Sequence, residues 1–495
     1  MRKANFDSEF CGNLPIHHIN TIQPYGAVVL LDKHDLRIIQ VSANIATYLD
    51  LEPQAAVGTV FVTHILETRE EFLMRLEESV RKKITVELTV SGKPIRMWAT
   101  EHELYYMLEL QLAQQNNPSQ FGGLQQVRQL VAELDAVDEL QEACDLIVRN
   151  IQTMLDIDGV MMYKFDADWN GKVIAESKTD ALEPYLGVTF PASDVPRQAR
   201  ELYLKNPIRL IPDRTYTPAR LYPVINPLTN AFTDLSASFL RGVADVHLEY
   251  MANMEVMGSM SLRVIHNGKL WGLISCNHSV PLDLSFEDSA NLALLTNVIS
   301  TKISSIINSD EYQFVSNLQQ DRNRIIDQVY KSGVKSGTLD DELNVLDLFR
   351  ATAAVIYDGN QRYVKGETPE ASFLDDVYLW LQAKEIKQVY ATHNLASVIE
   401  EAMHVSDQAS GMLVIPLSGS EPNYMVCFRP EVVKTIEWGG NPHQAINFDV
   451  GGKTYHPRNS FKVWMETVSQ TAMPWHEQEL QIANSIRSFL IEHKH

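Results

Sequence analysis

The chain has 495 residues, and its 42 Lys and Arg face 63 Asp and Glu, which gives a formal net charge of −21. This length is too great for one hydrophobic core and predicts two to four domains, while the 45% of hydrophobic residues is typical of a folded protein. The acidic balance argues against a sequence-independent grip on nucleic acid or anionic lipid, because the long-range field repels both.

Gaps of more than 100 residues separate the four cysteines, which are Cys11, Cys144, Cys276 and Cys427. This spacing fits neither a zinc site nor a disulfide framework, so we expect no metal and a reducing compartment. The N-terminal residues lack the apolar core of a signal peptide. No apolar run approaches the roughly 18 residues that span a bilayer. We therefore expect a cytoplasmic protein without a membrane partner.

The first predicted domain is small and of α+β type. Apolar strand patterns at 26–31 and 36–42 flank a polar turn, and helical patterns follow to about residue 82. Three further strands, with turns between them, are predicted at 84–90, 94–100 and 104–112. This order is typical of the antiparallel sheet of a PAS-type sensor domain. The polar residues 113–120 predict a linker after it.

A second domain is predicted from the segment that follows. Helical spacing of apolar residues returns at 124–154, and strands are predicted at 159–165 and 172–176. The pair Asn267-Gly268 predicts a hairpin, because both positions of such a turn need a positive φ. The stretch 184–236 is rich in proline and long for a structureless loop, so we expect it to be functional or partly helical.

A long helix is predicted next. From about Phe286 to Gln328 the chain has neither Gly nor Pro, and its apolar residues keep helical spacing. Two interpretations stay open. The chain forms either two helices broken near Ser309-Asp310, or a single signalling helix that joins two domains and lies partly in a dimer interface. We favour the single helix.

A third domain, similar in plan to the second, is predicted from about residue 333. Its strands are predicted at 354–357, 411–417 and 424–428. A long insertion rich in Gly, Pro, Asn and His then occupies 430–468. The last segment, 474–495, is a helical pattern that stops before it is complete, which indicates a further module downstream.

No catalytic motif stands out: the chain has no GxGxxG after a strand, no P-loop, no HExxH and no GxSxG, so we do not expect an enzyme. Four clusters are unusual, and they centre on Asp194, on His247 with Tyr250, on Asn277-His278, and on Trp438 with 457–461. Taken singly, each fits a structural role. Asp194 or Ser193, for example, could cap the helix that is predicted after Pro196.

Taken together, the clusters resemble the photosensory module of a phytochrome of the bacterial, biliverdin-binding type. The resemblance runs from about residue 11 to the C-terminus. It is carried by Cys11, Ile22-Gln-Pro-Tyr-Gly26, Pro191-Ala-Ser-Asp-Val-Pro196, His247-Leu-Glu-Tyr250, Trp271-Gly-Leu-Ile274, Trp438-Gly-Gly440 and Pro457-Arg-Asn-Ser-Phe461.

This resemblance implies an α+β fold of three tandem sensor domains, each an antiparallel sheet with helices, joined by long helices. The implied domains are an N-terminal segment with PAS at 1–118, a bilin-binding GAF domain at 119–308, and a PHY domain at 309–495 whose tongue lies at about 430–468. It also implies a figure-of-eight knot between PAS and GAF, with Ile22 at the threaded position.

The resemblance further implies the ligand, biliverdin IXα, held by a thioether to Cys11. Plant and many cyanobacterial phytochromes instead use a cysteine at the position of Val246, so a reduced bilin is not expected. Asp194 matches an acid whose backbone carbonyl faces the pyrrole nitrogens, where a buried cation needs acceptors. His247 matches a histidine that hydrogen-bonds the pyrrole water and a propionate. The matches to the propionate donors are Arg209, Arg241, Ser259 and Ser261. The matches to the aromatic wall around ring D are Tyr163, Phe190 and Tyr250.

One position departs from the family pattern. Asn277 stands where the family usually has a histidine that donates to the ring D carbonyl, and an amide is shorter and does not titrate. We expect a weaker or water-mediated contact and unusual dark-state properties. Val243 and Ala244 stand where a Ser/Thr–Ser pair is common, so we expect one propionate contact to be lost.

The resemblance also implies a mechanism. In the dark, Arg458 pairs with Asp194. After isomerisation of the bilin, Ser460 takes the place of Arg458 as the partner of Asp194. The tongue, which also contains Trp438, then refolds from a hairpin toward a helix. It implies a homodimer through GAF and the long helices, and an output module such as a histidine kinase or diguanylate cyclase. Two alternatives stay open: a non-photochemical GAF/PAS sensor of a cyclic nucleotide or haem, and an enzyme with unrecognised catalytic residues.

Overall fold

The computed structural model describes residues 19–113, 124–359, 361–418, 422–442, 447–448, 455–456 and 461–492. Cys11, Arg458 and Ser460 therefore lie outside the described residues, as does nearly all of the predicted linker at 113–120. The chain divides into two compact units. The first combines Met1–Ile306 with Glu437–Trp464, and the second combines Ile307–Ile436 with Met465–His495.

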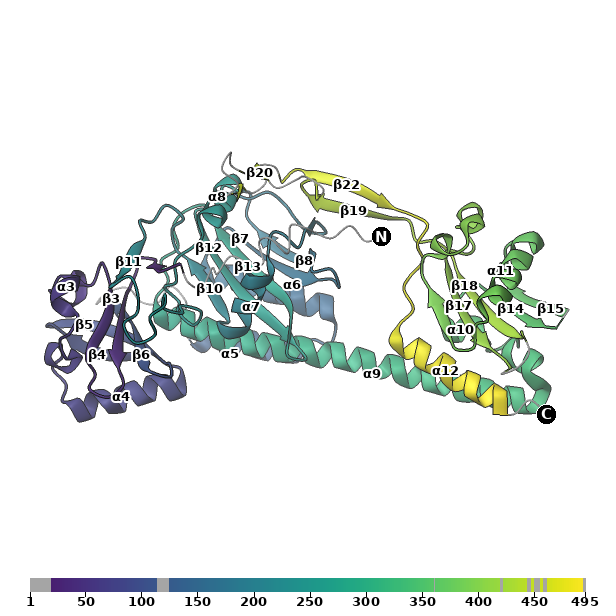
Figure 1. The fold of residues 1–495 in the computed structure, drawn as a ribbon, viewed down its shortest axis with the longest axis horizontal. Coiled ribbons are helices and arrows are strands. Elements are labelled where there is room, and N and C mark those ends of the chain that lie inside the picture. The colour runs from purple at the N-terminus through teal and green to yellow at the C-terminus, as the bar shows by residue number, and fades with distance from the viewer. Residues whose placement is uncertain are drawn as a thin grey trace. The chain divides into compact units, whose positions relative to one another are not determined.

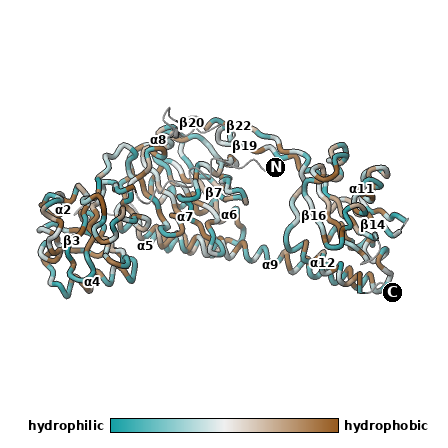
Figure 2. Tube along the Cα trace, viewed as in Figure 1, coloured by the Kyte–Doolittle hydropathy of each residue, from teal (hydrophilic) through white to brown (hydrophobic). Residues whose placement is uncertain are grey.

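The first sheet of the first unit has seven antiparallel strands in the order β1–β11–β3–β2–β6–β5–β4. Their bounds are β1 Thr21–Ile22, β2 Ala27–Asp32, β3 Ile38–Ser42, β4 Val86–Val90, β5 Lys93–Glu101, β6 Tyr105–Leu112 and β11 Ala219–Tyr222. One face packs against the helices α2 Ala46–Leu49, α3 Pro53–Ala56 and α4 Arg69–Lys82. The predicted strands of the first domain are thus confirmed, and Figure 2 shows hydrophobic residues in the strands around β3.

Two strands of this sheet come from outside the predicted first domain. β1 belongs to the N-terminal segment, and β11 comes from the stretch 184–236. The side chain of Ile22 on β1 is fully buried, and its backbone also forms a bridge with Arg241. This interleaving agrees with the expected knot, but the preceding segment lies outside the described residues, so the knot stays a prediction.

The second sheet of the first unit has eight strands in the order β10–β12–β13–β7–β8–β9–β19–β22. Their bounds are β7 Gly159–Phe165, β8 Gly171–Lys178, β9 Thr189–Phe190, β10 Ile208–Ile211, β12 Gly258–His266, β13 Lys269–His278, β19 Lys434–Gly439 and β22 Val463–Val468. Asn267 and Gly268 join β12 to β13 with φ of 49° and 72°, which confirms the predicted hairpin. The remaining short strands, β20 Asn447–Phe448 and β21 Tyr455–His456, pair with each other.

Four helices accompany the second sheet, namely α5 Leu124–Asp135, α6 Leu140–Leu155, α7 Arg197–Lys205 and α8 Asp245–Asn253. Helix α6 has apolar residues at 143, 147, 148 and 151, a helical spacing that buries one side against β7 and β8. Figure 1 shows the start of α9 beside α5, and Lys302 of α9 donates to the carbonyl of Asp135 in α5. The stretch 184–236 therefore contains a helix and three strands, as its length required.

The long helix α9 extends over Phe286–Thr338, and its only non-helical residue is Gly333, with φ of 83°. The alternative of a break near Ser309-Asp310 is therefore wrong, and the predicted single helix is confirmed. Of the described residues, only α9 has a segment long and apolar enough to cross a membrane, with a mean hydropathy of 1.2. A third of that segment is buried inside the fold, and core helices of soluble proteins pass the same test, so this is weak evidence for a membrane span.

The second unit is built on a five-stranded antiparallel sheet in the order β15–β14–β18–β17–β16. The strands are β14 Ala353–Asp358, β15 Gln361–Gly366, β16 Tyr390–Thr392, β17 Gly411–Pro416 and β18 Tyr424–Arg429. One face packs against the later part of α9, α10 Val345–Phe349 and α12 Glu477–Glu492, and the other against α11 Ala371–Lys384. Short 3-10 turns occupy Leu395–Ser397 and Glu400–Val405 in this unit, and Phe61–His64 in the first unit. The α+β class with three sheets and helices is confirmed.

Candidate functional site

Three strands of the second sheet present polar side chains on one face. Arg209 on β10 lies opposite Ser261 on β12, and Ser259 on β12 lies opposite Asn277 on β13. Alternate residues of a strand face the same side, so Ser259 and Ser261 share this face. Ser259 Oγ donates to Oδ1 of Asn277 over 3.2 Å. The structure thus brings together four residues that were expected to contact one ligand.

Three basic side chains gather beside this face. Arg209 donates from Nη1 to the carbonyl of Arg241 over 2.7 Å and from Nη2 to the carbonyl of Gly242 over 2.8 Å. Burial lowers the pKa of Arg209, and burial together with the charge of Arg209 lowers the pKa of Arg241 to about 9. His247 is exposed to solvent, yet desolvation by the protein atoms around its ring and the charges of both arginines lower its pKa to about 4. A bound carboxylate would raise all three pKa values, so the cluster fits an anionic ligand.

An acidic residue lies near the basic cluster. Tyr250 on α8 donates from its hydroxyl to Oδ2 of Asp194 over 2.9 Å. The rings of Tyr250 and His247 are stacked, with centroids 5.9 Å apart and an interplanar angle of 8°. The N-cap of α7 is Pro196, and no side chain caps the helix. The alternative that Asp194 or Ser193 is simply an N-cap is therefore wrong, and the Asp194 carboxylate faces α8 instead.

Aromatic side chains close another part of the site. Phe190 makes edge-to-face contacts with Tyr163 and with Tyr185, each with centroids 5.5 Å apart. Phe461 contacts Tyr250 in the same way at 5.0 Å. The rings of Tyr163, Tyr185, Phe190 and Phe461 belong to one hydrophobic cluster. Tyr250 is joined to this cluster through its contact with Phe461 from the late insertion.

The late insertion reaches this site through two strands. β19 joins β9 in parallel, with Trp438 opposite Thr189, and the Trp438 side chain is buried. A Cβ added at Gly439 would lie 2.8 Å from the ring of Phe190, so glycine permits this close approach. Within the first unit, Trp438, Gly439 and Phe461 of the insertion therefore lie on the aromatic wall.

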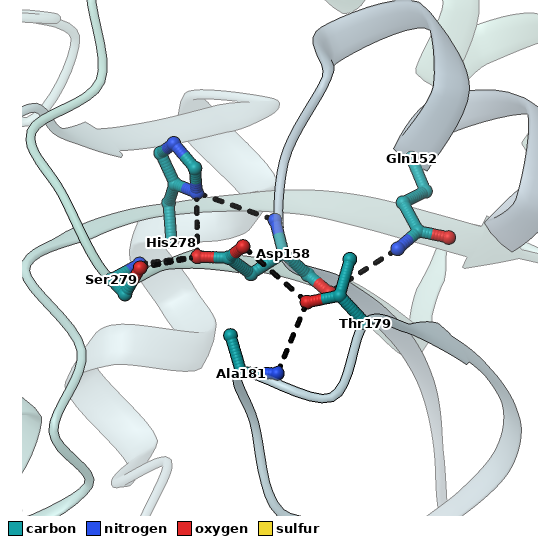
Figure 3. Close-up of polar contacts among 6 residues, drawn as sticks. All are labelled: Gln152, Asp158, Thr179, Ala181, His278 and Ser279. Carbon is teal, nitrogen blue, oxygen red and sulfur yellow. Dashed lines mark hydrogen bonds and ion pairs between the residues drawn. The ribbon is translucent and has the colours of Figure 1, made fainter.

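A polar clasp fixes the end of β13 next to Asn277. Figure 3 shows the Asp158 carboxylate between His278 and Ser279 on one side and Thr179 on the other. Asp158 Oδ2 lies 2.8 Å from Nδ1 of His278 and accepts hydrogen bonds from the Ser279 backbone and hydroxyl at 2.8 and 2.6 Å. Burial raises the pKa of Asp158, but the bonds from Ser279 and the charge of His278 outweigh it and lower the pKa. The clasp ties the end of β13 to Asp158, the residue that directly precedes β7.

The sequence missed several residues that line this region. Tyr203 on α7 is half-buried, and desolvation raises its pKa, while a hydrogen bond with Ser261 partly offsets the rise. The Tyr216 hydroxyl accepts from the backbone of Val243 over 2.8 Å. Val243 itself is buried in an apolar cluster, and Ala244 caps α8 without a side-chain bond. A tyrosine within a polar stretch carries no local signal of its partner, which explains why these were not identified.

Three family models match the chain: a PAS fold at residues 11–113, a GAF domain at 139–307 and a phytochrome region at 318–494. The structure is similar to that of the bacteriophytochrome of the photosynthetic bacterium R. palustris, with a TM-score of 0.82 and 30% sequence identity over 97% of this chain and 98% of that one. The chain belongs to the phytochrome family. It is a photosensory module of a red/far-red, bilin-binding photoreceptor.

Other phytochromes agree. The photosensory core of a phytochrome from Stigmatella aurantiaca matches with a TM-score of 0.81 and 32% identity, over 97% of each chain. Cyanobacterial phytochrome B of Nostoc sp. is 33% identical over 98% of this chain, and a bacteriophytochrome of Pseudomonas aeruginosa is 31% identical over 97%. The chain covers 66% of the length of each of these two relatives.

Proposed function

We propose that this photosensory module binds biliverdin IXα covalently through Cys11. The observation that carries the proposal is the basic group of Arg209, Arg241 and His247 beside the Tyr250–Asp194 hydrogen bond. It offers donors to two carboxylates at one end and acceptors to protonated nitrogens at the other. The assignment to Cys11 rests on the resemblance, and Val246 at the alternative cysteine position supports it.

Each residue of the site has a task in this proposal. Arg209 and Arg241 bind the propionates, with Ser259 and Ser261 as neutral donors. His247 and Asp194 hold the protonated pyrroles, while Tyr163, Phe190 and Tyr250 restrict ring D. The bilin supplies light absorption and the isomerisation of the double bond between rings C and D. Asn277 offers its amide nitrogen to the ring D carbonyl, because this nitrogen is the only hydrogen-bond donor of its side chain.

The tongue transmits the change. In the dark state Arg458 pairs with Asp194, and after illumination Ser460 takes its place, so that Asp194 releases the tongue. Refolding from strand to helix shortens the segment, since the rise per residue falls from about 3.3 Å to about 1.5 Å. The β-hairpin of β19 and β22 supports the strand form as one of the two states.

The proposal extends to the surroundings of the module. Domain boundaries at 118 and 308 follow from the resemblance, and the tongue occupies about 430–468. The module works as a cytoplasmic homodimer through GAF and the long helices, without enzymatic activity of its own. Its partner is a C-terminal output module, for example a histidine kinase or a diguanylate cyclase. The incomplete coverage of the relatives' length supports a further module.

The test combines the purified protein with biliverdin and records spectra after red and far-red illumination, followed by denaturation to detect covalent attachment. We expect a reversible difference spectrum, and loss of covalent attachment in Cys11→Ala. Cys144→Ala is the matched control, because burial raises the pKa of Cys144 to about 12 and makes its thiol inert. Bilin binding without photoconversion would favour a non-photochemical sensor, and attachment that persists in Cys11→Ala would overturn the Cys11 assignment.

A further inference from the structure

A fully buried carboxylate lies in the middle of β6. The side chain of Glu109 is 0% exposed, between the buried residues Leu108 and Leu110. Its neighbours across the sheet are Val28 and Trp98. A carboxylate in such surroundings is costly unless it is hydrogen-bonded, and residues of this type are rarely buried completely. Its position therefore calls for a partner that needs an acceptor.

That partner is a segment next to the basic cluster. Glu109 Oε1 accepts from the Ser238 hydroxyl over 2.6 Å and from the Leu240 backbone over 2.9 Å. Ser238 and Leu240 are both buried. Since Arg241 directly follows Leu240, the carboxylate anchors the backbone immediately before one of the basic side chains.

The N-terminal segment holds the same backbone from the other side. Gln23 donates from its backbone to the Leu240 carbonyl over 2.7 Å and from Nε2 to the Arg241 carbonyl over 3.2 Å. Gly242 donates to the Thr21 carbonyl over 2.8 Å. The segment 238–242 is thus clamped between Glu109 of the PAS sheet and residues 21–23.

This clamp sets the position of both arginines. Arg241 belongs to the clamped segment, and the guanidinium of Arg209 donates to the carbonyls of Arg241 and Gly242. A displacement of the segment would therefore move one arginine directly and the other through its two acceptors.

We propose that Glu109 is a positioning residue of the bilin site, which acts through Ser238 and Leu240 to place Arg241 and Arg209 against the ligand's carboxylates. The proposal rests on the proposed function, in which these arginines bind the propionates. It gives the PAS domain a specific task in ligand recognition, although Glu109 itself contacts no ligand.

The test compares biliverdin with its dimethyl ester, which lacks both carboxylate charges. Binding is measured in a Cys11→Ala background, so that it stays reversible. A charge-assisted hydrogen bond is worth roughly tenfold in affinity or more, and we expect the protein with Glu109 to prefer biliverdin by about that factor. Glu109→Leu should lose most of this preference, and Glu109→Gln should keep it, because the amide oxygen still accepts from Leu240.

Two further measurements separate positioning from general destabilisation. Arg241→Leu should lose the same preference, and the double variant with Glu109→Leu should lose little more, because both changes remove one interaction. In the protein without ligand, amide exchange at 238–242 should accelerate in Glu109→Leu and not in Glu109→Gln. If Glu109→Leu fails to fold, Ser238→Ala, which removes one of the two donors, should lose part of the preference.

Different results would overturn the proposed function and the positioning role of Glu109. If the protein with Glu109 does not bind biliverdin, the proposed function is wrong, and this inference is wrong with it. If it binds and prefers biliverdin, but Glu109→Leu keeps the full preference, the proposed function stands and the positioning role of Glu109 is overturned.

Discussion

At the scale of single residues, Asn277 is the position where this chain departs from its family. Its Oδ1 accepts from Ser259, and its amide nitrogen is the only donor that the side chain can offer to ring D. In Asn277→His we expect shifted absorption and a changed rate of thermal reversion, because imidazole reaches further and titrates. Asn277→Asp should shift reversion further still, since an ionised carboxylate cannot donate. Spectra and reversion rates that match the unmodified protein in both variants would contradict a role at ring D.

The burial of Glu109 also predicts that the stability of the protein depends on pH. Burial raises its pKa to about 7, so the folded protein binds a proton that the unfolded chain has released above pH 4.5. The stability that this group contributes is present below pH 4.5 and is lost as the pH rises through 7. The loss amounts to about 3 kcal/mol. The other titratable group facing it, Tyr25, does not interfere, because burial keeps its pKa far above this window.

Glu109→Gln removes this titration. We expect the free energy of unfolding of the variant to exceed that of the unmodified protein by more at pH 8 than at pH 5, as measured by urea unfolding without ligand. Glu103→Gln, at an exposed position near the same strand, is the control and should show no such trend. A difference that is the same at both pH values would show that Glu109 does not titrate in this range.

These two residues show what the sequence could and could not predict. Asn277 was identified because it follows a hairpin with a clear turn signal and belongs to a recognisable motif. Glu109 was not identified, because a glutamate between two leucines is the alternating pattern of a half-buried strand, in which the charged residue faces solvent. Only the segment 238–242, more than 100 residues later in the chain, makes its burial possible.

At the scale of elements, predictability followed the strength of local signals. Helix α9 was predicted because Gly and Pro are absent from 286–328, and it is interrupted only at Gly333. The resemblance implied a hairpin in the tongue, but the local sequence pattern did not predict the strands β19 and β22. Residues of β22 alternate between exposed and partly buried. β19 instead begins with exposed residues and ends with the buried Trp438 and Gly439, where it pairs with β9, about 250 residues earlier in the chain. Non-local pairing of this kind leaves little trace in the local sequence.

The proposed switch of this hairpin depends on Asp194. We expect Asp194→Ala to attach the bilin but to lose the light-driven change in amide exchange over 434–439 and 463–468. The reason is that the tongue no longer has a carboxylate whose ion pair it can release on illumination. Asp180→Ala, an exposed aspartate of the same domain, should keep the full light response. Normal light-driven exchange in Asp194→Ala would separate the tongue from this carboxylate.

At the scale of the whole molecule, the two units have separate cores, and the second depends on a buried ion pair. Arg429 at the end of β18 lies 2.6 Å from Glu479 on α12, and the two side chains are 6% and 0% exposed. Arg429 also donates to the carbonyls of Phe349, Met473 and Pro474. One guanidinium thus joins three parts of this unit that are distant in the sequence.

Removing one member of such a pair leaves a buried charge without its counter-ion. We expect Glu479→Leu to lower the free energy of unfolding of the second unit by about 3–5 kcal/mol. The matched control is Asp375→Leu, whose pair with Arg362 is exposed, and which should cost about 1 kcal/mol or less. Hydrogen exchange resolves the two units, and faster exchange in β14, β17 and β18 with an unchanged rate in β12 and β13 is the expected result. Equal acceleration in both would mean that the units unfold as one cooperative body, and equal costs of the two variants would mean that burial adds nothing to the Arg429–Glu479 pair.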